Sequence, residues 1–321
     1  MDFLNYTDWQ DTADTLHMLL QMSGKVKLLY RAKRPEWAHI RQYLTLDGIS
    51  TGIVPEAPVP FEINFDFRED QVVFRNYNGK TEKVALEDGK SVGDYYRQFM
   101  AALKQIDVPA RIDVKSQEFY DPVDLDKDGK HRSYQKEAVL LWLDNMLFAD
   151  RALNRFLAPF RGKVTCPAYY FGTMDLSCLV YSGEAAPWGR EDKVMQYAFE
   201  EKCYECGFWP GDPNFPKPAF YGMPYPFVKD LQGNDKFLRP DKAFFKPEKQ
   251  EFFFTLEDAL NYPNPEKMVI DIFPTGEFLY QIEAGTVKID DHFFWIRIIQ
   301  SILQRKEELL FFRFKESFIG P

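Results

Sequence analysis

The chain has 321 residues, of which 45% are hydrophobic and 28% are charged. This balance is typical of folded globular proteins and excludes disorder over the whole chain, and the length suffices for one large domain or two ordinary ones. The net charge of −9, without a long basic stretch, argues against general binding to nucleic-acid backbones.

The first part of the chain predicts one long helix followed by short strands. Apolar residues recur at helical spacing over residues 8–22, and Gly24 is expected to end that helix. β-like runs follow at residues 25–30, 40–46, 49–54, 61–67 and 71–76, and residues 61–67 alternate strictly between apolar and polar side chains. Ser91 is expected to cap a further helix that reaches about residue 106.

The second part mixes helices, strands and a long aromatic segment. A helix is predicted over residues 133–157, with Pro159 just beyond its end. Two β-like runs at 168–172 and 176–181 precede a predicted helix at 191–204. Residues 207–226 are rich in Pro, Gly and aromatic residues, which indicates a long ordered loop. An apolar stripe over residues 290–318 is typical of a docking helix.

These elements predict an α+β protein with largely antiparallel sheets and packed helices. We expect a first lobe at 1–120, a second lobe at 121–265 that carries the aromatic loop, and a C-terminal extension at 266–321. Gly24-Lys25-Val26 and Gly162-Lys163-Val164 both follow a predicted helix. Their recurrence suggests an internal repeat, with a ligand pocket between two similar lobes.

The expected cellular compartment of the protein is inferred from the absence of signal and membrane-spanning patterns in the sequence. The N-terminus has no basic region followed by an apolar run, and no apolar stretch reaches the roughly 20 residues that span a bilayer. We therefore expect a cytoplasmic protein with neither membrane nor nucleic-acid partners, and four free thiols. Cys203 and Cys206 form a lone C-x-x-C pair without the second pair that structural zinc needs, so no cofactor is predicted.

Polar side chains at the predicted helix ends are the first candidates for a site. His17 and Gln21 share one helix face, and Lys25 follows just past the expected helix end. Lys163 and Asp175 are the corresponding groups of the second lobe. Together they could bind a polar ligand, with His17 acting as acid or base. The alternative is a solvated or hydrogen-bonded helix face, on which the lysines only neutralise helix C-termini.

Aromatic residues and an acidic turn are the second set of candidates. Trp209, Tyr221 and Tyr225 could stack on a planar ligand or could simply pin the predicted loop to the core. The carboxylates of Asp124, Asp126 and Asp128 match the first half of a calcium loop. Gln135 stands where such a loop needs a bidentate Glu, so an acidic turn without calcium is the favoured interpretation.

Several short motifs resemble a bacterial family of unknown function, the domain of unknown function 5996. They are Thr15-Leu16-His17, Phe65-Asp66-Phe67, Asp94-Tyr95-Tyr96-Arg97 and Gly207-Phe208-Trp209-Pro210-Gly211. The resemblance covers about residues 8–260 and implies no activity. Our best hypothesis is a protein that binds a small polar molecule in an interlobe pocket. The alternative is a non-enzymatic module that docks onto a partner through its aromatic loops and C-terminal helix. The sequence decides neither enzymatic activity nor oligomeric state.

Overall fold

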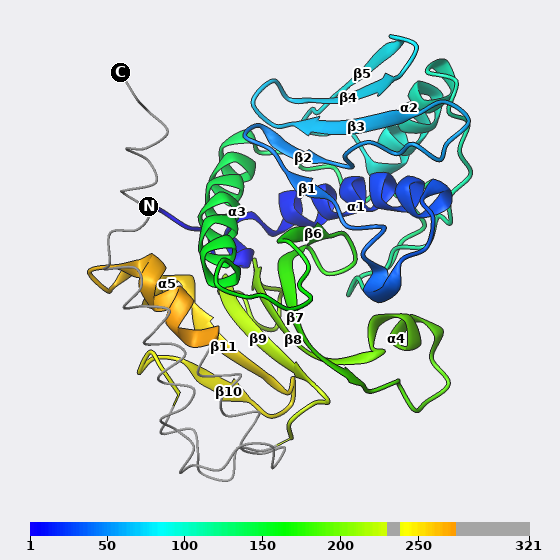
Figure 1. Cartoon of the computed structure of the whole chain (residues 1–321). Coiled ribbons are helices and arrows are strands. Elements are labelled where there is room, and N and C mark those ends of the chain that lie inside the picture. Colours follow the sequence, from blue (N-terminus) through cyan, green and yellow to red (C-terminus); the bar gives the residue numbers. More distant parts are fainter. Residues whose placement is uncertain (230–237, 274–321) are drawn as a thin grey trace, which may run out of the picture.

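The computed structural model describes residues 1–229 and 238–273 and consists of two antiparallel sheets with packed helices (Figure 1). α1 (Tyr6–Tyr30) runs between the two sheets, and α3 (Lys136–Leu157) packs against α1 and against the second sheet. The predicted α+β class with antiparallel sheets is confirmed. Among the described residues, no helix is long and apolar enough to cross a membrane.

The first sheet contains five short strands in sequence order. They are β1 (Tyr43–Leu44), β2 (Gly48–Ser50), β3 (Phe61–Asp66), β4 (Gln71–Asn76) and β5 (Thr81–Ala85). The alternation predicted for β3 is confirmed, because its apolar side chains are buried and the polar ones between them are half-buried. α2 (Val92–Gln105) covers β5, and the Ser91 hydroxyl accepts a hydrogen bond from the Asp94 amide at 3.1 Å, as predicted for a cap.

The second sheet contains six strands in the order β10-β11-β9-β8-β7-β6. They are β6 (Ala168–Tyr170), β7 (Asp175–Ala185), β8 (Glu201–Trp209), β9 (Ala219–Tyr225), β10 (Phe244–Lys246) and β11 (Glu251–Thr255). A single-turn 3-10 helix (Pro35–Trp37) packs against α4 (Lys193–Ala198), and α5 (Leu256–Leu260) follows β11.

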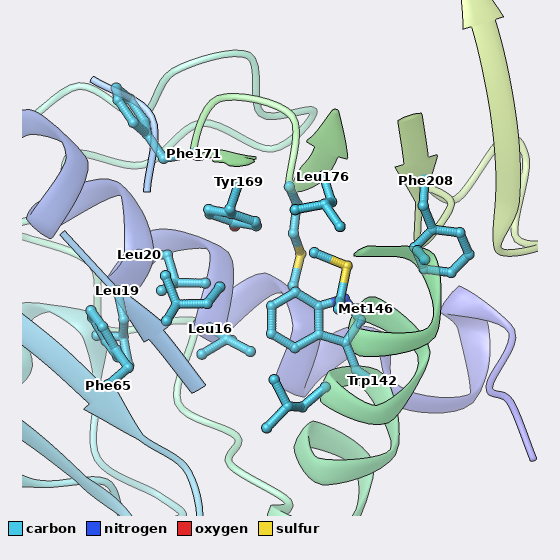
Figure 2. Close-up of a cluster of buried hydrophobic side chains, with 14 of the residues drawn as sticks. Leu16, Leu19, Leu20, Phe65, Trp142, Met146, Tyr169, Phe171, Leu176 and Phe208 are labelled. Carbon is cyan, nitrogen blue, oxygen red and sulfur yellow. The ribbon is translucent and has the colours of Figure 1, made fainter. Parts of the chain in front are cut away.

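One hydrophobic core joins both sheets (Figure 2). It takes side chains from α1, α3 and one face of each sheet, so the two predicted lobes share a core although each sheet falls within one of them. The residues labelled in Figure 2 are Leu16, Leu19, Leu20, Phe65, Trp142, Met146, Tyr169, Phe171, Leu176 and Phe208.

The strand predicted at residues 25–30 is wrong, because α1 continues to Tyr30. Gly24 lies inside this helix and does not end it. A Cβ atom at Gly24 would lie 2.1 Å from Cδ1 of Phe171, so only glycine lets the helix approach this ring. The glycine serves tight packing, which a single sequence cannot distinguish from a helix stop.

The helix predicted at 191–204 and the loop predicted at 207–226 are also wrong. Only Lys193–Ala198 is helical, and residues 201–209 and 219–225 form adjacent strands of the second sheet. Pairing with β7 and β11 satisfies the backbone of these two strands and overrides their unusual Gly, Pro and aromatic composition.

The suggested internal repeat gains no support from the structure. Gly24-Lys25-Val26 is helical, whereas Gly162-Lys163-Val164 lies outside any helix, between α3 and β6. The sheets also differ in strand number and order. The docking helix predicted at 290–318 lies outside the described residues.

Candidate functional site

A cavity of about 470 Å³ lies on the face of the second sheet that points away from the core. Side chains alternate along each strand, so one set packs into the core and the other set forms the cavity floor. On β7, for example, Leu176 and Cys178 join the core, whereas Ser177 and Leu179 line the cavity. The floor residues are Asp175, Ser177, Leu179, Glu205, Trp209, Tyr221, Met223, Glu251 and Phe253.

The walls of the cavity come from segments far apart in the sequence. They include the first half of α1, residues 36–41, the loop at 118–120 and α4. The main wall residues are Tyr6, His17, Trp37, Arg41, Phe119, Tyr120, Met195 and Phe199. The cavity therefore combines residues of both predicted lobes, and it has the size of ordinary small-molecule pockets.

Tyr221 links the two acidic groups at the centre of the floor. Its hydroxyl lies 2.5 Å from Oδ2 of Asp175 and 3.2 Å from Oε1 of Glu205. The ring crosses over Gly207, its partner on β8, where a Cβ atom would lie 2.4 Å from Cε1 of Tyr221. Glycine at this position thus allows the tyrosine to lie flat across the strand and to reach β7.

The two linked carboxyl groups have different surroundings. Asp175 is 4% exposed and accepts hydrogen bonds from the hydroxyls of Thr173 and Tyr221. Glu205 is half-buried, and desolvation raises its pKa, with the negative charge of Asp175 raising it further. A carboxyl group whose pKa is raised by burial beside a second carboxyl group is a frequent feature of acid–base sites.

A third carboxyl group adds to the acidity of the floor. Burial raises the pKa of Glu251 to about 7, and the negative charges of Glu205 and Asp175 contribute. Lys249 opposes this shift, and its ammonium lies 4.7 Å from the ring centroid of Trp209. Glu251 therefore titrates near neutral pH.

Arg41 provides the deepest positive charge at the floor. It is 6% exposed, and its Nη2 donates to the carbonyl of Ala168 at 3.0 Å and to the carbonyl and hydroxyl oxygens of Ser177, the carbonyl at 2.7 Å. The guanidinium ties residues 36–41 to β6 and β7, and its charge lowers the pKa of Glu205. It offsets part of the negative charge at the floor.

The structure brings His17 and Asp175 to the same cavity, but the contacts of His17 indicate a structural role. Burial lowers its pKa to about 4, so the ring is neutral at pH 7. Its Nε2 donates to the carbonyl of Phe171 at 2.8 Å, and its ring packs edge-on against Phe119. The imidazole therefore holds two cavity-forming segments together and is a poor acid or base in this state.

The two other candidates on α1 serve the loop at 115–117. Gln21 donates from Nε2 to the Gln117 carbonyl at 2.8 Å and accepts from the Gln117 amide at 2.7 Å. Lys25 is a buried residue of the helix itself, and its ammonium donates to the carbonyl of Lys115 at 2.5 Å. Neither residue lines the cavity. Both side chains are buried and hydrogen-bonded, which agrees with the alternative of a hydrogen-bonded helix face and not with a solvated one.

The remaining predicted site residues divide between the cavity and its surroundings. Trp209 lines the floor, but it lies on a strand and not on a loop. Tyr225 stacks on Phe199 at 4.3 Å behind the cavity wall. Lys163 forms ion pairs with Glu36 at 2.8 Å and with Glu201 at 3.1 Å, so it neutralises carboxylates and not a helix end.

The acidic turn and the cysteines offer no metal site within residues 1–229 and 238–273. Asp128 is buried and accepts from the amides of Lys130 and His131 and from the His131 ring, whereas Asp124 pairs with Lys127. No group of three metal-ligating side chains occurs in this part of the chain. All four cysteines are free, and Cys203 and Cys206 lie on opposite faces of β8.

Sequence reasoning missed the two glutamates and the arginine at the centre of the cavity. Glu205 lies between Tyr204 and Cys206, and Glu251 directly precedes three phenylalanines. A single glutamate in a strongly apolar strand is unusual, because burying a carboxyl group is costly. For Glu205 this signal carries no weight while residues 191–204 are predicted as a helix, and Glu251 lies in a segment for which no strand is predicted.

The chain matches one family model over residues 2–292, and that model describes a family of unknown function (DUF5996). No curated protein and no solved structure matches the chain significantly.

Proposed function

Because the chain belongs to the DUF5996 family, whose function is unknown, we propose a function from the site geometry alone. The proposal is that the protein binds a small polar molecule in the cavity on the second sheet and exchanges a proton with it through Glu205 and Asp175. The bridge from Tyr221 to both carboxyl groups is the observation that carries it. The bridge supports proton transfer because it holds two carboxyl groups, one of them with a raised pKa, against one hydroxyl.

Burying these carboxyl groups lowers the stability of the fold, and this loss of stability supports a functional role for them. Two half-buried glutamates and a buried aspartate face one another across the floor, and burial raises the pKa of Glu205 and Glu251. An apolar floor would be more stable, since isolated buried carboxyl groups are among the costly features of a fold. Perturbed carboxyl groups in a cleft are typical of binding and catalytic sites.

The alternative of a module that docks onto a partner has weaker support. It depended on exposed aromatic loops at 207–226 and on a C-terminal helix. The aromatic residues of β8 and β9 are buried or half-buried in the sheet, and the predicted helix lies outside the described residues. The proposed cytoplasmic location is consistent with the free, buried thiols of Cys178, Cys203 and Cys206.

A fragment screen by ligand-observed NMR tests the proposal. Met223 projects into the cavity from β9, so Met223→Trp should fill the binding space. Val73→Trp is the matched control, because Val73 is a half-buried strand residue of the first sheet that does not line the cavity. We expect fragments that bind wild type and Val73→Trp and do not bind Met223→Trp, with the fold of each variant checked by circular dichroism. Fragments that bind all three proteins equally, or none that bind wild type, would refute the proposal.

A further inference from the structure

The cavity has two chemically different ends. One end gathers the polar groups of Asp175, Ser177, Glu205, Tyr221 and Glu251. The other end is formed by half-buried or buried apolar side chains that pack on one another. These are Met195, Phe199 and Phe227, and Leu179 and Met223 pack in the same cluster while also being the cross-strand neighbours of Glu205 at the polar end. A ligand that fills both ends carries a polar head and an apolar arm.

The polar end of the cavity contains both negatively and positively charged groups. The carboxylate of Asp175 lies there with the cations of Arg41 and Lys249, and Glu251 titrates near neutral pH. A ligand with a carboxylate would meet the charge of Asp175, and a ligand with an ammonium would meet those of Arg41 and Lys249. Either charge would lose its hydration without a full set of opposite partners.

Hydroxyl groups suit this mixture better than charged groups do. A ligand hydroxyl can donate to the carboxylate of Asp175 and accept from a protonated carboxyl or from an ammonium. The protein uses the same solution itself, since the hydroxyls of Thr173 and Tyr221 are the groups that hydrogen-bond Asp175.

We infer that the ligand is an uncharged polyhydroxylated molecule with an apolar substituent, such as an aryl or alkyl glycoside. Its hydroxyl groups lie among Asp175, Glu205 and Tyr221, and its apolar arm lies against Met195 and Phe199. This inference rests on the proposed function, because it names the class of molecule that the same cavity binds.

Three probes with one common arm test the charge of the head group. They are 3-phenoxy-1,2-propanediol, 2-phenoxyethylamine and 3-phenoxypropionate, measured by isothermal titration calorimetry at pH 7. We expect the diol to bind wild type at least about tenfold more tightly than either charged probe, the ratio that one good hydrogen bond to a charged group provides. Asp175→Asn should remove most of the discrimination against 3-phenoxypropionate, because it removes the repelling charge.

The apolar arm is tested separately with Met195→Ala. This change should weaken all three probes by a similar factor, about three- to tenfold, since it shortens the contact with the shared phenyl group. Glu62→Gln on the first sheet is the control and should change none of the affinities. Tighter binding of the amine or the propionate, or no binding of the diol while other fragments occupy the cavity, overturns the inference and leaves the proposed function standing. A cavity that binds no fragment at all overturns both.

Discussion

Side chains alternate between the two faces of both sheets in this protein, but the surroundings of the two outward faces differ. Each buries one face against the shared core. On the first sheet, the other face meets water, and its Glu62 lies 3.9 Å from Arg75 on the neighbouring strand in an exposed ion pair. On the second sheet, the other face is covered by α1, α4 and two loops, and its glutamates lie in a cavity. Alternation along a strand only places a polar side chain on the outward face of the sheet. The comparison shows that the segments packed over that face decide whether the side chain is solvated or becomes a candidate functional group.

The largest expected effect concerns the pH dependence that Glu251 imposes. Its pKa rises from 4.5 to about 7 on folding, so the folded state binds more protons between these values and stability falls as pH rises through them. The expected loss is about 3 kcal/mol of unfolding free energy. Measured by urea titration, Glu251→Gln should remove this contribution, so that from pH 5 to pH 8 its unfolding free energy changes by about 3 kcal/mol more in the stabilising direction than that of wild type. Glu62→Gln, on the solvent-facing side of the first sheet, should leave the pH dependence of the unfolding free energy as in wild type. The same pH dependence in both variants would contradict the idea that the segments packed over the second sheet shift the pKa of Glu251.

His17, in the cover itself, should give a slope of the opposite sign. Its pKa falls from 6.5 to about 4 on folding, so the unfolded state binds more protons in this range and stability is lost as pH falls through it. The corresponding loss is about 3 kcal/mol. His17→Gln should remove this contribution, so that on going from pH 7 to pH 4 its unfolding free energy changes by about 3 kcal/mol more in the stabilising direction than that of wild type. An unchanged slope in that range would show that the imidazole is more accessible than its burial indicates.

Gly207→Val is expected to disturb the floor by moving Tyr221. The new side chain would overlap the tyrosine ring, and such overpacking costs about 2 kcal/mol of unfolding free energy. The variant should also lose fragment binding in the cavity, because the hydroxyl can no longer reach Asp175. Gly129→Val is the control, since no atom lies within 4 Å of a Cβ at that position. Thermal unfolding and the NMR screen measure both effects, and intact binding in a destabilised Gly207→Val would argue against the positioning of Tyr221 by this glycine.

The smallest effect is expected on the open face of the first sheet. Arg75→Ala removes the exposed ion pair with Glu62, and pairs of this kind contribute little. The unfolding free energy should change by less than about 0.5 kcal/mol, measured by urea titration. A loss above 1 kcal/mol would mean that this face is not as open as the comparison requires.

The sequence by itself determined the elements that depend on neighbours along the chain. The alternation of Phe61 to Phe67 predicted β3, the Ser91 cap predicted the start of α2, and helical spacing predicted α1 and α3. Of the seven residues that it predicted for one site, His17, Asp175 and Trp209 line the cavity, and Gln21, Lys25, Lys163 and Tyr225 do not. Periodicity and capping are local, so a single sequence carries them.

Only the tertiary structure decided which polar residues are covered by other segments and so line the cavity. Gly24 and Gly207 look like breakers in the sequence, yet each makes room for an aromatic ring from a distant segment. β8 and β9 exist because each pairs with strands on both sides, and this pairing places Glu205 and Tyr221 beside Asp175. The pKa of a carboxyl group depends on what surrounds it in space, and the surroundings here come from residues up to about two hundred positions away, a separation that no local pattern records.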